Sequence, residues 1–331
     1  MNESSGFQAR NPLPISAIVP TLDRPAALGR TLHSLAAQGV LPAELIVIDG
    51  STGTSSKDVV EQYAVQWSPQ CVVTWRKASQ LGAAVQRNQG IALATQPVVW
   101  FFDDDIIFEE GCLQRLWQAL EADRALAGVN AMITNQNYHP PGMVSRTVFA
   151  ILNGRREASY AGRGLGPAVN LLPEDRDTLP EVVPVEWLNT TCTLYRREAL
   201  PEPVFDSVFT GYSLMEDVAL SLRVGRNQKL ANARSARIFH DSQPGAHKAD
   251  PRALSCMELV NRHYVMTQIL GRVRIRDFCK LWFWELFQLA LAAKSERLGA
   301  RFWLRLQGKW RAVKRILESD PNGSTNAGAK N

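Results

Sequence analysis

The sequence predicts an α/β protein in which helices cover both faces of a mostly parallel sheet. Over the first 122 residues, short apolar runs alternate with amphipathic segments, which is the pattern of repeated strand–helix units. The runs are apolar almost throughout, as expected for strands buried on both faces. With 331 residues, 45% of them hydrophobic, the chain can also build a sizeable core.

The expected elements follow in order. The first strand is ISAIVP (15–20), and the helix after it, 23–39, has Leu28, Leu32 and Leu35 on one face. Pro25 lies in the first turn of that helix and Gly39 just past its end, as is usual. The remaining elements are strands at 45–49, 72–76 and 97–103 and helices at 56–67, 82–94 and 111–122. Residues 136–180 are rich in Gly, Pro and Arg without a clear period, so we expect loops there, lying over the site.

Charge divides the chain unequally. Residues 251–331 contain 15 Lys+Arg against 6 Asp+Glu, and residues 1–250 contain 22 against 26. We expect basic helices at 253–270, 277–295 and 299–317. Their aromatic and basic side chains suit helices that lie in the surface of an anionic membrane, and equally a helical cap that packs on the rest of the protein. The chain shows no recognisable nucleic-acid-binding module, so we expect no nucleic-acid partner.

The sequence also indicates the compartment. The five cysteines are far apart and include no C-x-x-C pair, which favours a reducing environment. The polar N-terminus lacks the apolar core of a signal peptide. The apolar segment 281–293 is shorter than a membrane span requires. We therefore expect a cytoplasmic protein, which would lie on the inner face of the plasma membrane if its basic helices bind lipid and do not form a cap.

Polar residues follow three of the expected strands: PTLDR (20–24), DGST (49–52) and DDD (103–105). Because ligands of such sheets bind beyond the carboxyl ends of the strands, we expect these segments to converge. Asp103 and Asp105 form a D-x-D pair, which can offer oxygen ligands to Mg²⁺ or Mn²⁺. The alternative is that the aspartates cap a helix or lie solvated in a turn. No glycine-rich dinucleotide or P-loop motif supports another phosphate site.

The order of these motifs resembles family 2 glycosyltransferases over roughly residues 14–242. The matching pieces are IVPTLDRPAALGRTLHSLAAQ, ELIVIDGST, RNQGIALA, VVWFFDDDI, VEWLNTTCTLYRREAL, FDSVFTGYSLMEDVALSLRVGR and FHD. The resemblance implies the GT-A fold and inverting transfer of a sugar from a UDP-, dTDP- or GDP-linked donor. The acceptor it implies is a hydroxyl of a glycan or lipid-linked molecule, in surface polysaccharide synthesis.

The resemblance implies a GT-A glycosyltransferase domain over residues 14–250. Composition and charge add a disordered N-terminus (1–13), a basic helical region (251–318) that could attach to a membrane surface, and a disordered tail (319–331).

The resemblance assigns the donor and the metal to specific residues. The donor-binding residues are Pro20, Thr21, Asp23, Asp49, Arg87, Asp103 and Asp104, and the Mn²⁺ or Mg²⁺ ligands are Asp105, Asp103 and His240. Where the family often shows two aspartates after the second strand, this chain has Ile48 before Asp49. Simpler roles stay open: Thr21 and Asp23 could cap the first helix, Arg87 could extend to solvent, and His240 could be structural.

Inverting transfer needs a base that takes the proton of the acceptor hydroxyl. By resemblance to the family's "ED" motif, Asp217 is the expected base, and Glu216 binds the acceptor or holds the loop. Acidic residues are also common in the first turn of any helix, where they complement its dipole. The acceptor segment would include Trp187, Asn189 and Thr190, although the family often has glycines after the tryptophan, and Trp187 equally suits the core.

Two other functions remain open from the residues alone. A metal-dependent phosphatase or nucleotidyltransferase can also bring D-x-D carboxylates to a phosphate, although such phosphatases usually have their aspartates after the first strand. A catalytically degenerate donor-binding or scaffold subunit of a glycan assembly complex would keep the fold and lose the chemistry.

Overall fold

A computed structural model describes residues 11–136, 138–242 and 250–319. The chain forms two compact units, of which the first comprises 1–140, 161–163 and 170–243 and the second 141–160, 164–169 and 244–331. Most of the two terminal segments expected to be disordered, 1–13 and 319–331, lies outside the described residues.

The first unit is built on a mixed sheet. Its elements are β1 (Leu13–Thr21), α1 (Pro25–Ala36), β2 (Pro42–Asp49), α2 (Ser55–Trp67), β3 (Val72–Lys77), α3 (Ala83–Leu93), β4 (Val98–Phe102), β5 (Ile106–Phe108), α4 (Cys112–Ala122), β6 (Leu126–Ile133), β9 (Val182–Val185), β10 (Cys192–Arg196), a 3₁₀ turn (Arg197–Ala199), α6 (Glu216–Val224) and β11 (Lys229–His240). The expected elements up to residue 122 are confirmed, with boundaries moved by three residues at most.

Strand order explains where the site lies. Within the described residues nine strands pair in the order β3-β2-β1-β4-β10-β6-β11-β5, with β9 beside β11. β1, β2, β3 and β4 are parallel to their neighbours in that group, as are β6 and β11, so the predicted mostly parallel sheet is confirmed. The chain runs outward from β1 to β3 and then returns to place β4 on the other side of β1. Such a reversal opens a crevice at the carboxyl ends of the two strands.

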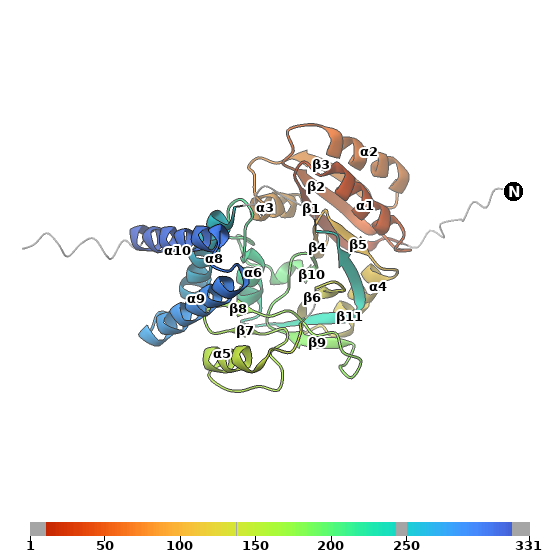
Figure 1. Ribbon diagram of the computed structural model, residues 1–331. Coiled ribbons are helices and arrows are strands. Elements are labelled where there is room, and N and C mark those ends of the chain that lie inside the picture. The colour runs from red at the N-terminus through yellow and green to blue at the C-terminus, as the bar shows by residue number, and fades with distance from the viewer. Residues whose placement is uncertain (1–10, 137, 243–249, 320–331) are drawn as a thin grey trace, which may run out of the picture. The chain divides into compact units, whose positions relative to one another are not determined.

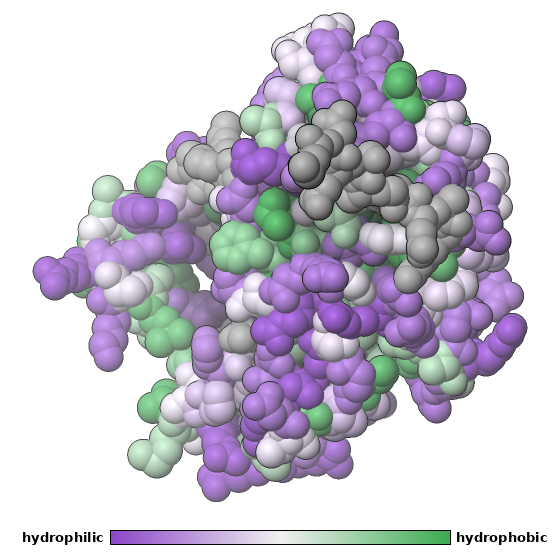
Figure 2. Space-filling model, turned by 90° about the vertical axis from the view of Figure 1, so that its right-hand side faces the viewer, coloured by the Kyte–Doolittle hydropathy of each residue, from purple (hydrophilic) through white to green (hydrophobic). Residues whose placement is uncertain are grey.

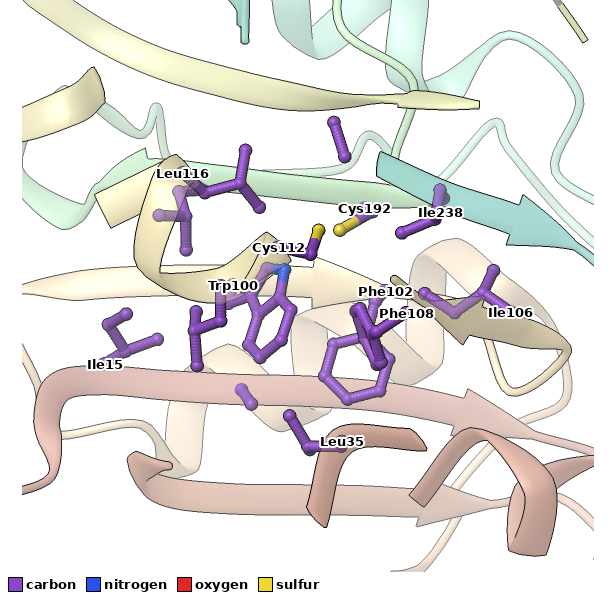
Figure 3. Packing of buried hydrophobic residues seen from close by; sticks show 14 of the residues in the cluster. Ile15, Leu35, Trp100, Phe102, Ile106, Phe108, Cys112, Leu116, Cys192 and Ile238 are labelled. Carbon is purple, nitrogen blue, oxygen red and sulfur yellow. The ribbon is translucent and has the colours of Figure 1, made fainter. Parts of the chain in front are cut away.

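Helices cover both faces of this sheet (Figure 1). α1, α2 and α4 contribute to one large apolar cluster, in which the rings of Trp100, Phe102 and Phe108 pack together (Figure 3). The centroid of Phe102 lies 4.6 Å from that of Trp100 and 5.3 Å from that of Phe108. Cys112 and Cys192 turn their sulfur atoms toward each other beside these rings, and all five cysteines are free. Each large side chain buried in this way contributes about 1.5–3 kcal/mol to folding.

Glycines let α3 and α6 approach the other face. A Cβ on Gly90 of α3 would lie 2.4 Å from Cγ2 of Ile18 in β1, so only glycine permits this contact. A Cβ on Gly128 of β6 would lie 2.7 Å from the Tyr195 ring, and the Tyr195 hydroxyl is 3.3 Å from Ser221 Oγ in α6. The close packing fixes both helices relative to the strand ends, and both carry residues expected in the site.

The second unit is helical. It contains α5 (Met143–Asn153), β7 (Gly164–Leu165), α8 (Pro251–Tyr264) continued by a π-helical segment (Val265–Ile269), α9 (Ile275–Ser295) and α10 (Ala300–Ser319), while β8 (Val169–Asn170) contains the unit boundary. The three expected basic helices are confirmed. The expectation of loops throughout 136–180 is wrong, because α5 buries Val148, Phe149 and Leu152 along one face between Gly142 and Gly154.

α8, α9 and α10 are held together by a buried ionic cluster. Lys309 Nζ lies 2.6 Å from Glu285 Oε2 and 3.1 Å from Glu258 Oε2, and Arg262 lies 3.3 Å from Glu285 Oε1. A Cβ on Gly308 would lie 2.4 Å from the Arg252 carbonyl oxygen, which shows how closely α8 and α10 approach.

The described helices include none that is both long and apolar enough to cross a membrane. Hydrophilic residues cover most of the face shown in Figure 2, with smaller groups of hydrophobic residues between them.

Candidate active site

Three polar segments meet where β1, β2 and β4 end. Thr21 Oγ1 donates a hydrogen bond to Asp104 Oδ2 at 2.6 Å. The Asp23 amide donates to Ser51 Oγ at 2.7 Å, and Asp23 Oδ1 accepts from the Thr52 amide at 3.2 Å. The convergence predicted from PTLDR, DGST and DDD is therefore confirmed. Neither Thr21 nor Asp23 caps α1, whose N-cap position makes no side-chain cap bond.

Arginines pair with all three aspartates of the triplet. Arg24 contacts Asp104 at 2.6 Å and Asp105 at 2.9 Å, and Arg87 contacts Asp103 at 2.7 Å. Asp104 is fully buried, and burial raises its pKa to about 7, against the opposing effects of Arg24 and of the Thr21 hydrogen bond. These contacts offset the repulsion of adjacent anions. The helix-cap alternative for the triplet is wrong, because the residues lie between β4 and β5.

Two of these carboxylates form a group with a histidine. Asp103, Asp105 and His240 each offer one ligand atom, and these three atoms lie within 4.8 Å of one another. His240 Nε2 lies 3.3 Å from Asp105 Oδ1, and its Nδ1 lies 3.1 Å from the amide nitrogen of Gln136, so contacts on both sides orient the ring. Two carboxylates and an imidazole form a donor set that fits Mn²⁺, whereas Mg²⁺ prefers oxygen ligands alone.

Arg87 joins the strand end to α6. Its side chain is 3% exposed and donates to Asp103 Oδ1 at 2.7 Å and to Glu216 Oε1 at 2.9 Å. Burial disfavours the charged guanidinium, but the charges of Asp103 and Glu216 outweigh burial and raise its pKa. The alternative in which Arg87 extends to solvent is therefore wrong.

The turn before α6 is tied directly to α3. The Ala83 amide donates to the Gly211 carbonyl at 3.3 Å, and the Ala84 amide donates to Ser213 Oγ at 3.2 Å. Ser213 and Met215 adopt left-handed backbone conformations, with φ of 56° and 74°, and such strain is commonly found at functional sites. These bonds bring Glu216 within reach of Arg87, although the two residues are 129 positions apart.

Glu216 and Asp217 are neighbouring carboxyls in different environments, because Glu216 is buried and Asp217 is half-buried. Burial raises the pKa of Glu216 to about 8, and the Asp217 charge adds to the effect. Burial also raises the pKa of Asp217, to about 6, but the Val218 amide, which donates to Asp217 Oδ1 at 2.7 Å, and the Arg87 charge oppose it. At neutral pH Asp217 is thus the more readily ionised of the two, which suits a base.

The residues expected on the acceptor side lie deeper than the sequence indicated. Trp187, Asn189 and Thr190 are all buried. The Trp187 ring nitrogen donates to the Leu171 carbonyl at 2.7 Å, which anchors the side chain in the interior. The buried Asn189 Oδ1 has no hydrogen-bond partner among the described residues, and an unpaired buried acceptor of this kind costs about 1–3 kcal/mol.

Two residues expected to bind the donor, Asp49 and Pro20, are already packed against other parts of the protein. Asp49 is fully buried and accepts from the Ser51 amide at 2.8 Å and from the Trp75 ring nitrogen at 3.1 Å. Pro20 is buried in β1, opposite Ile48 of β2.

Three residues of the site were not singled out from the sequence. Arg24 lies inside the motif PTLDR, and the signal available was that three adjacent aspartates need a positive charge nearby to offset their repulsion. Gln86 donates to the carbonyls of Thr21 and Ile48 at 3.0 and 2.7 Å, which joins the ends of β1 and β2. Burial raises the pKa of Tyr212, and so do the charges of Asp103, Glu216, Asp105 and Asp217. The Tyr212 hydroxyl thus interacts electrostatically with carboxylates of the aspartate triplet and with those at the start of α6.

The sequence profile described as "Glycosyl transferase family 2" matches residues 16–202, more than half of the chain. The chain belongs to glycosyltransferase family 2. This glycosyltransferase is 34% identical over 96 residues to a validoxylamine A glucosyltransferase of Streptomyces hygroscopicus subsp. limoneus, a match that covers 28% of this chain and 20% of the relative. It is 30% identical over 107 residues to an uncharacterized glycosyltransferase of Nostoc sp., covering 32% of this chain and 33% of the relative. The matches thus span a third or less of these relatives.

Solved structures show the fold of this glycosyltransferase. The mannosyltransferase PcManGT of Pyrobaculum calidifontis, solved with GDP-Man and Mn²⁺, superposes with a TM-score of 0.55 at 14% identity, over 94% of this chain and 89% of that one. GalNAc-T7, solved with UDP, GalNAc and Mn²⁺, gives a TM-score of 0.54 at 16% identity, over 92% and 56% of the two chains. The GT-A-like fold predicted from the sequence is confirmed.

Proposed function

We propose that this family 2 glycosyltransferase transfers a sugar from a nucleoside diphosphate donor to a hydroxyl of a glycan or lipid-linked acceptor, with inversion. The observation that carries the proposal is the double contact of buried Arg87 with Asp103 and Glu216. It joins the segment expected to bind the donor to the segment expected to contain the base. Carboxylates that are remote in sequence thereby belong to one charged network, as a transfer between two substrates requires.

In this proposal each part of the network has a distinct role. Asp217 takes the proton of the acceptor hydroxyl, and Arg87 limits the rise of its pKa. Asp103, Asp105 and His240 would hold a divalent cation, Mn²⁺ in preference to Mg²⁺, which when bound neutralises the negative charge of the leaving diphosphate. The residues that would bind the rest of the donor are Pro20, Thr21, Asp23, Asp49, Arg87 and Asp104.

The proposed acceptor side rests on Glu216, Asn189 and Thr190. The unpaired Asn189 Oδ1 supports this assignment, because a sugar hydroxyl could donate the missing hydrogen bond. For Trp187 we propose a supporting role, since its ring nitrogen is already bonded to Leu171. A surface polysaccharide or its lipid-linked precursor is the acceptor class that we propose.

A panel of UDP-, dTDP- and GDP-linked sugars tests the proposal. With Mn²⁺ present, we expect one nucleotide class to raise the melting temperature, because a ligand at 100 times its Kd stabilises the folded state by about 2.7 kcal/mol. EDTA or Asp105→Asn should remove the shift. The control Asp177→Asn changes a fully exposed carboxylate of the same unit and should leave the shift intact.

The same panel separates the alternatives. A protein that binds a donor with Mn²⁺ but releases no nucleoside diphosphate, with or without added acceptors, would be the scaffold subunit. Release of inorganic phosphate would indicate the phosphatase. Indifference to every nucleotide sugar with either ion would contradict the proposal.

We further propose that α10 binds the surface of an anionic membrane, at the inner face of the plasma membrane. One side of α10 packs on α8 through Gly308, Lys309 and Ala312. The opposite side exposes Trp303, Leu306, Trp310 and Leu317, which recur at helical spacing. The same helix exposes four basic side chains: Arg301, Arg311, Lys314 and Arg315. Exposed apolar residues and cations on one helix suit the interface of a bilayer that contains anionic lipids.

Vesicle sedimentation tests the membrane proposal. We expect the full chain to bind vesicles of phosphatidylcholine and phosphatidylglycerol in low salt, and to be released at about 1 M salt, where the Debye length falls to about 3 Å. The double variant Trp303→Ser and Trp310→Ser should bind much more weakly. Val65→Ser, which alters an exposed apolar residue of the first unit, should bind as the unmodified chain does. Absent or salt-insensitive binding would contradict the proposal.

A further inference from the structure

The second unit contains a cavity of about 460 Å³, which is independent of the proposed active site. Its wall comes from the end of α5, from the segment around β7, from Met266 in the π-helical segment, from Arg272 and from the start of α9. Pockets of this volume commonly take small-molecule ligands. All of its lining residues belong to the second unit.

The charge of this cavity is strongly positive. Arg272, Arg276 and Lys280 line it, against a single acidic residue, Asp277. The carboxylate of Asp277 is engaged at the start of α9, where it accepts from the Arg274 amide at 3.1 Å. The Arg276 side chain is 71% exposed and its Nε lies 3.7 Å from Asp277, beyond hydrogen-bond distance. Positive charge in the cavity therefore exceeds negative charge.

Two of the cations are held in place by backbone carbonyls of the wall. Lys280 Nζ donates to the Leu152 carbonyl at 2.7 Å, and Arg272 donates to the Gly166 carbonyl. Each keeps further N–H donors. Burial lowers the pKa of Lys280, and so do the charges of Arg272 and Arg276. Three cations that repel one another in a cavity are stabilised when an anion enters.

Exposed apolar side chains lie next to the cavity residues in the chain. Ile151 adjoins Leu152, and Val273 and Ile275 lie on either side of Arg274, with exposed fractions of 49%, 61% and 84%. A cationic cavity whose lining residues have exposed apolar neighbours in the chain suits a phosphate group carried on a lipid, and its polar interior equally suits free phosphate or diphosphate.

We infer that this cavity binds a phosphate or diphosphate group, with Arg272, Arg276 and Lys280 as its hydrogen-bond donors. The guanidinium groups offer paired N–H donors that match phosphate oxygens, and the ammonium adds a compact charge. All three donors belong to the second unit, so phosphate binding in this cavity does not depend on sugar transfer.

Calorimetric titration of the full chain with pyrophosphate in EDTA and 0.15 M salt, about physiological ionic strength, tests the inference. EDTA excludes cation-dependent binding at the donor site. We expect Arg276→Gln to weaken binding by about tenfold or more, the loss expected for a charge-assisted hydrogen bond, and Lys280→Gln to do the same. Lys294→Gln removes an exposed cation from the same helix outside the cavity, and should bind as the unmodified chain does.

Vesicles identify the source of the phosphate. Stronger binding to phosphatidic acid vesicles than to phosphatidylglycerol vesicles of equal charge would assign the cavity to a lipid-borne phosphate monoester, provided that Arg276→Gln loses this preference. Binding of pyrophosphate without that preference would assign it to a free ligand. Because Arg276 is largely exposed, its variant should fold even if Lys280→Gln does not.

Equal affinity of Arg276→Gln and the unmodified chain, or no binding of pyrophosphate, phosphate or phosphatidic acid, would overturn the inference. Mn²⁺-dependent stabilisation by a nucleotide sugar should persist in Arg276→Gln, so failure here is distinguishable from failure of the proposed transfer.

Discussion

Asp217→Asn should lower kcat about 10³-fold while the affinity for the donor stays nearly unchanged. An amide keeps the size of the side chain and can still accept from the Val218 amide, but it cannot take the proton of the acceptor hydroxyl. Loss of a general base typically costs 10²–10⁴-fold in rate. Transfer assays with the donor class found by thermal shift would measure kcat, and titration of the variant with that donor and Mn²⁺ would measure affinity.

Asp206→Asn is a suitable control for this variant. Asp206 belongs to the same unit and contacts Arg223 at 3.0 Å, outside the network of Arg24 and Arg87. It should keep most of the activity. If Asp217→Asn retained more than about a tenth of kcat, a smaller loss than removal of a general base gives, another group would be the base.

The pH profile of the unmodified enzyme examines the same assignment. Burial raises the pKa of Asp217 to about 6, above the ordinary value of about 3.9. The carboxylate is the active form, so kcat/KM should rise as pH increases through 6 and fall below it. An acid limb near pH 4 would mean that the essential carboxyl is an ordinary exposed one.

Arg87→Met should destabilise the fold by about 3–5 kcal/mol and abolish transfer. Removal of the guanidinium leaves Asp103 and Glu216 without their shared cation in a largely buried site, and breaking a buried ion pair from one side has a cost of this size. Loss of the Arg87 charge also raises the pKa of Asp217 further. Urea unfolding of the full chain would measure the stability, and the transfer assay the activity.

Two further substitutions distinguish the buried contacts of Arg87 with Asp103 and Glu216 from an ordinary ion pair on the surface. Arg30→Met makes the same change at a pair with Asp241 in which the side chains are 49% and 35% exposed, and should cost no more than about 1 kcal/mol. Arg87→Lys keeps one positive charge but loses the forked guanidinium that reaches two carboxylates. Its loss of stability should therefore lie between those of Arg30→Met and Arg87→Met. Equal losses of unfolding free energy in Arg87→Met and Arg30→Met would show that the contacts of Arg87 with Asp103 and Glu216 contribute little to stability.

Much of the fold was predictable because its signals are local. The apolar runs that become β1, β2, β3 and β4 are short and bounded by polar turns, and each helix between them buries one face. α5 was missed because the segment 136–180 around it is rich in Gly, Pro and Arg, a composition typical of loops. Its burial depends on packing within the second unit, which no local pattern reports.

The sequence by itself determined the parallel strands, the family and the polar segments that meet beyond β1, β2 and β4. Only the tertiary structure decided which cation pairs with which carboxylate: Arg24 with Asp105 across 81 positions, and Arg87 with Glu216 across 129. A motif indicates which side chains a segment carries. Whether two of them pair depends on the distance between their atoms and on their shared exclusion from water, and these exist only once the strands and helices have packed.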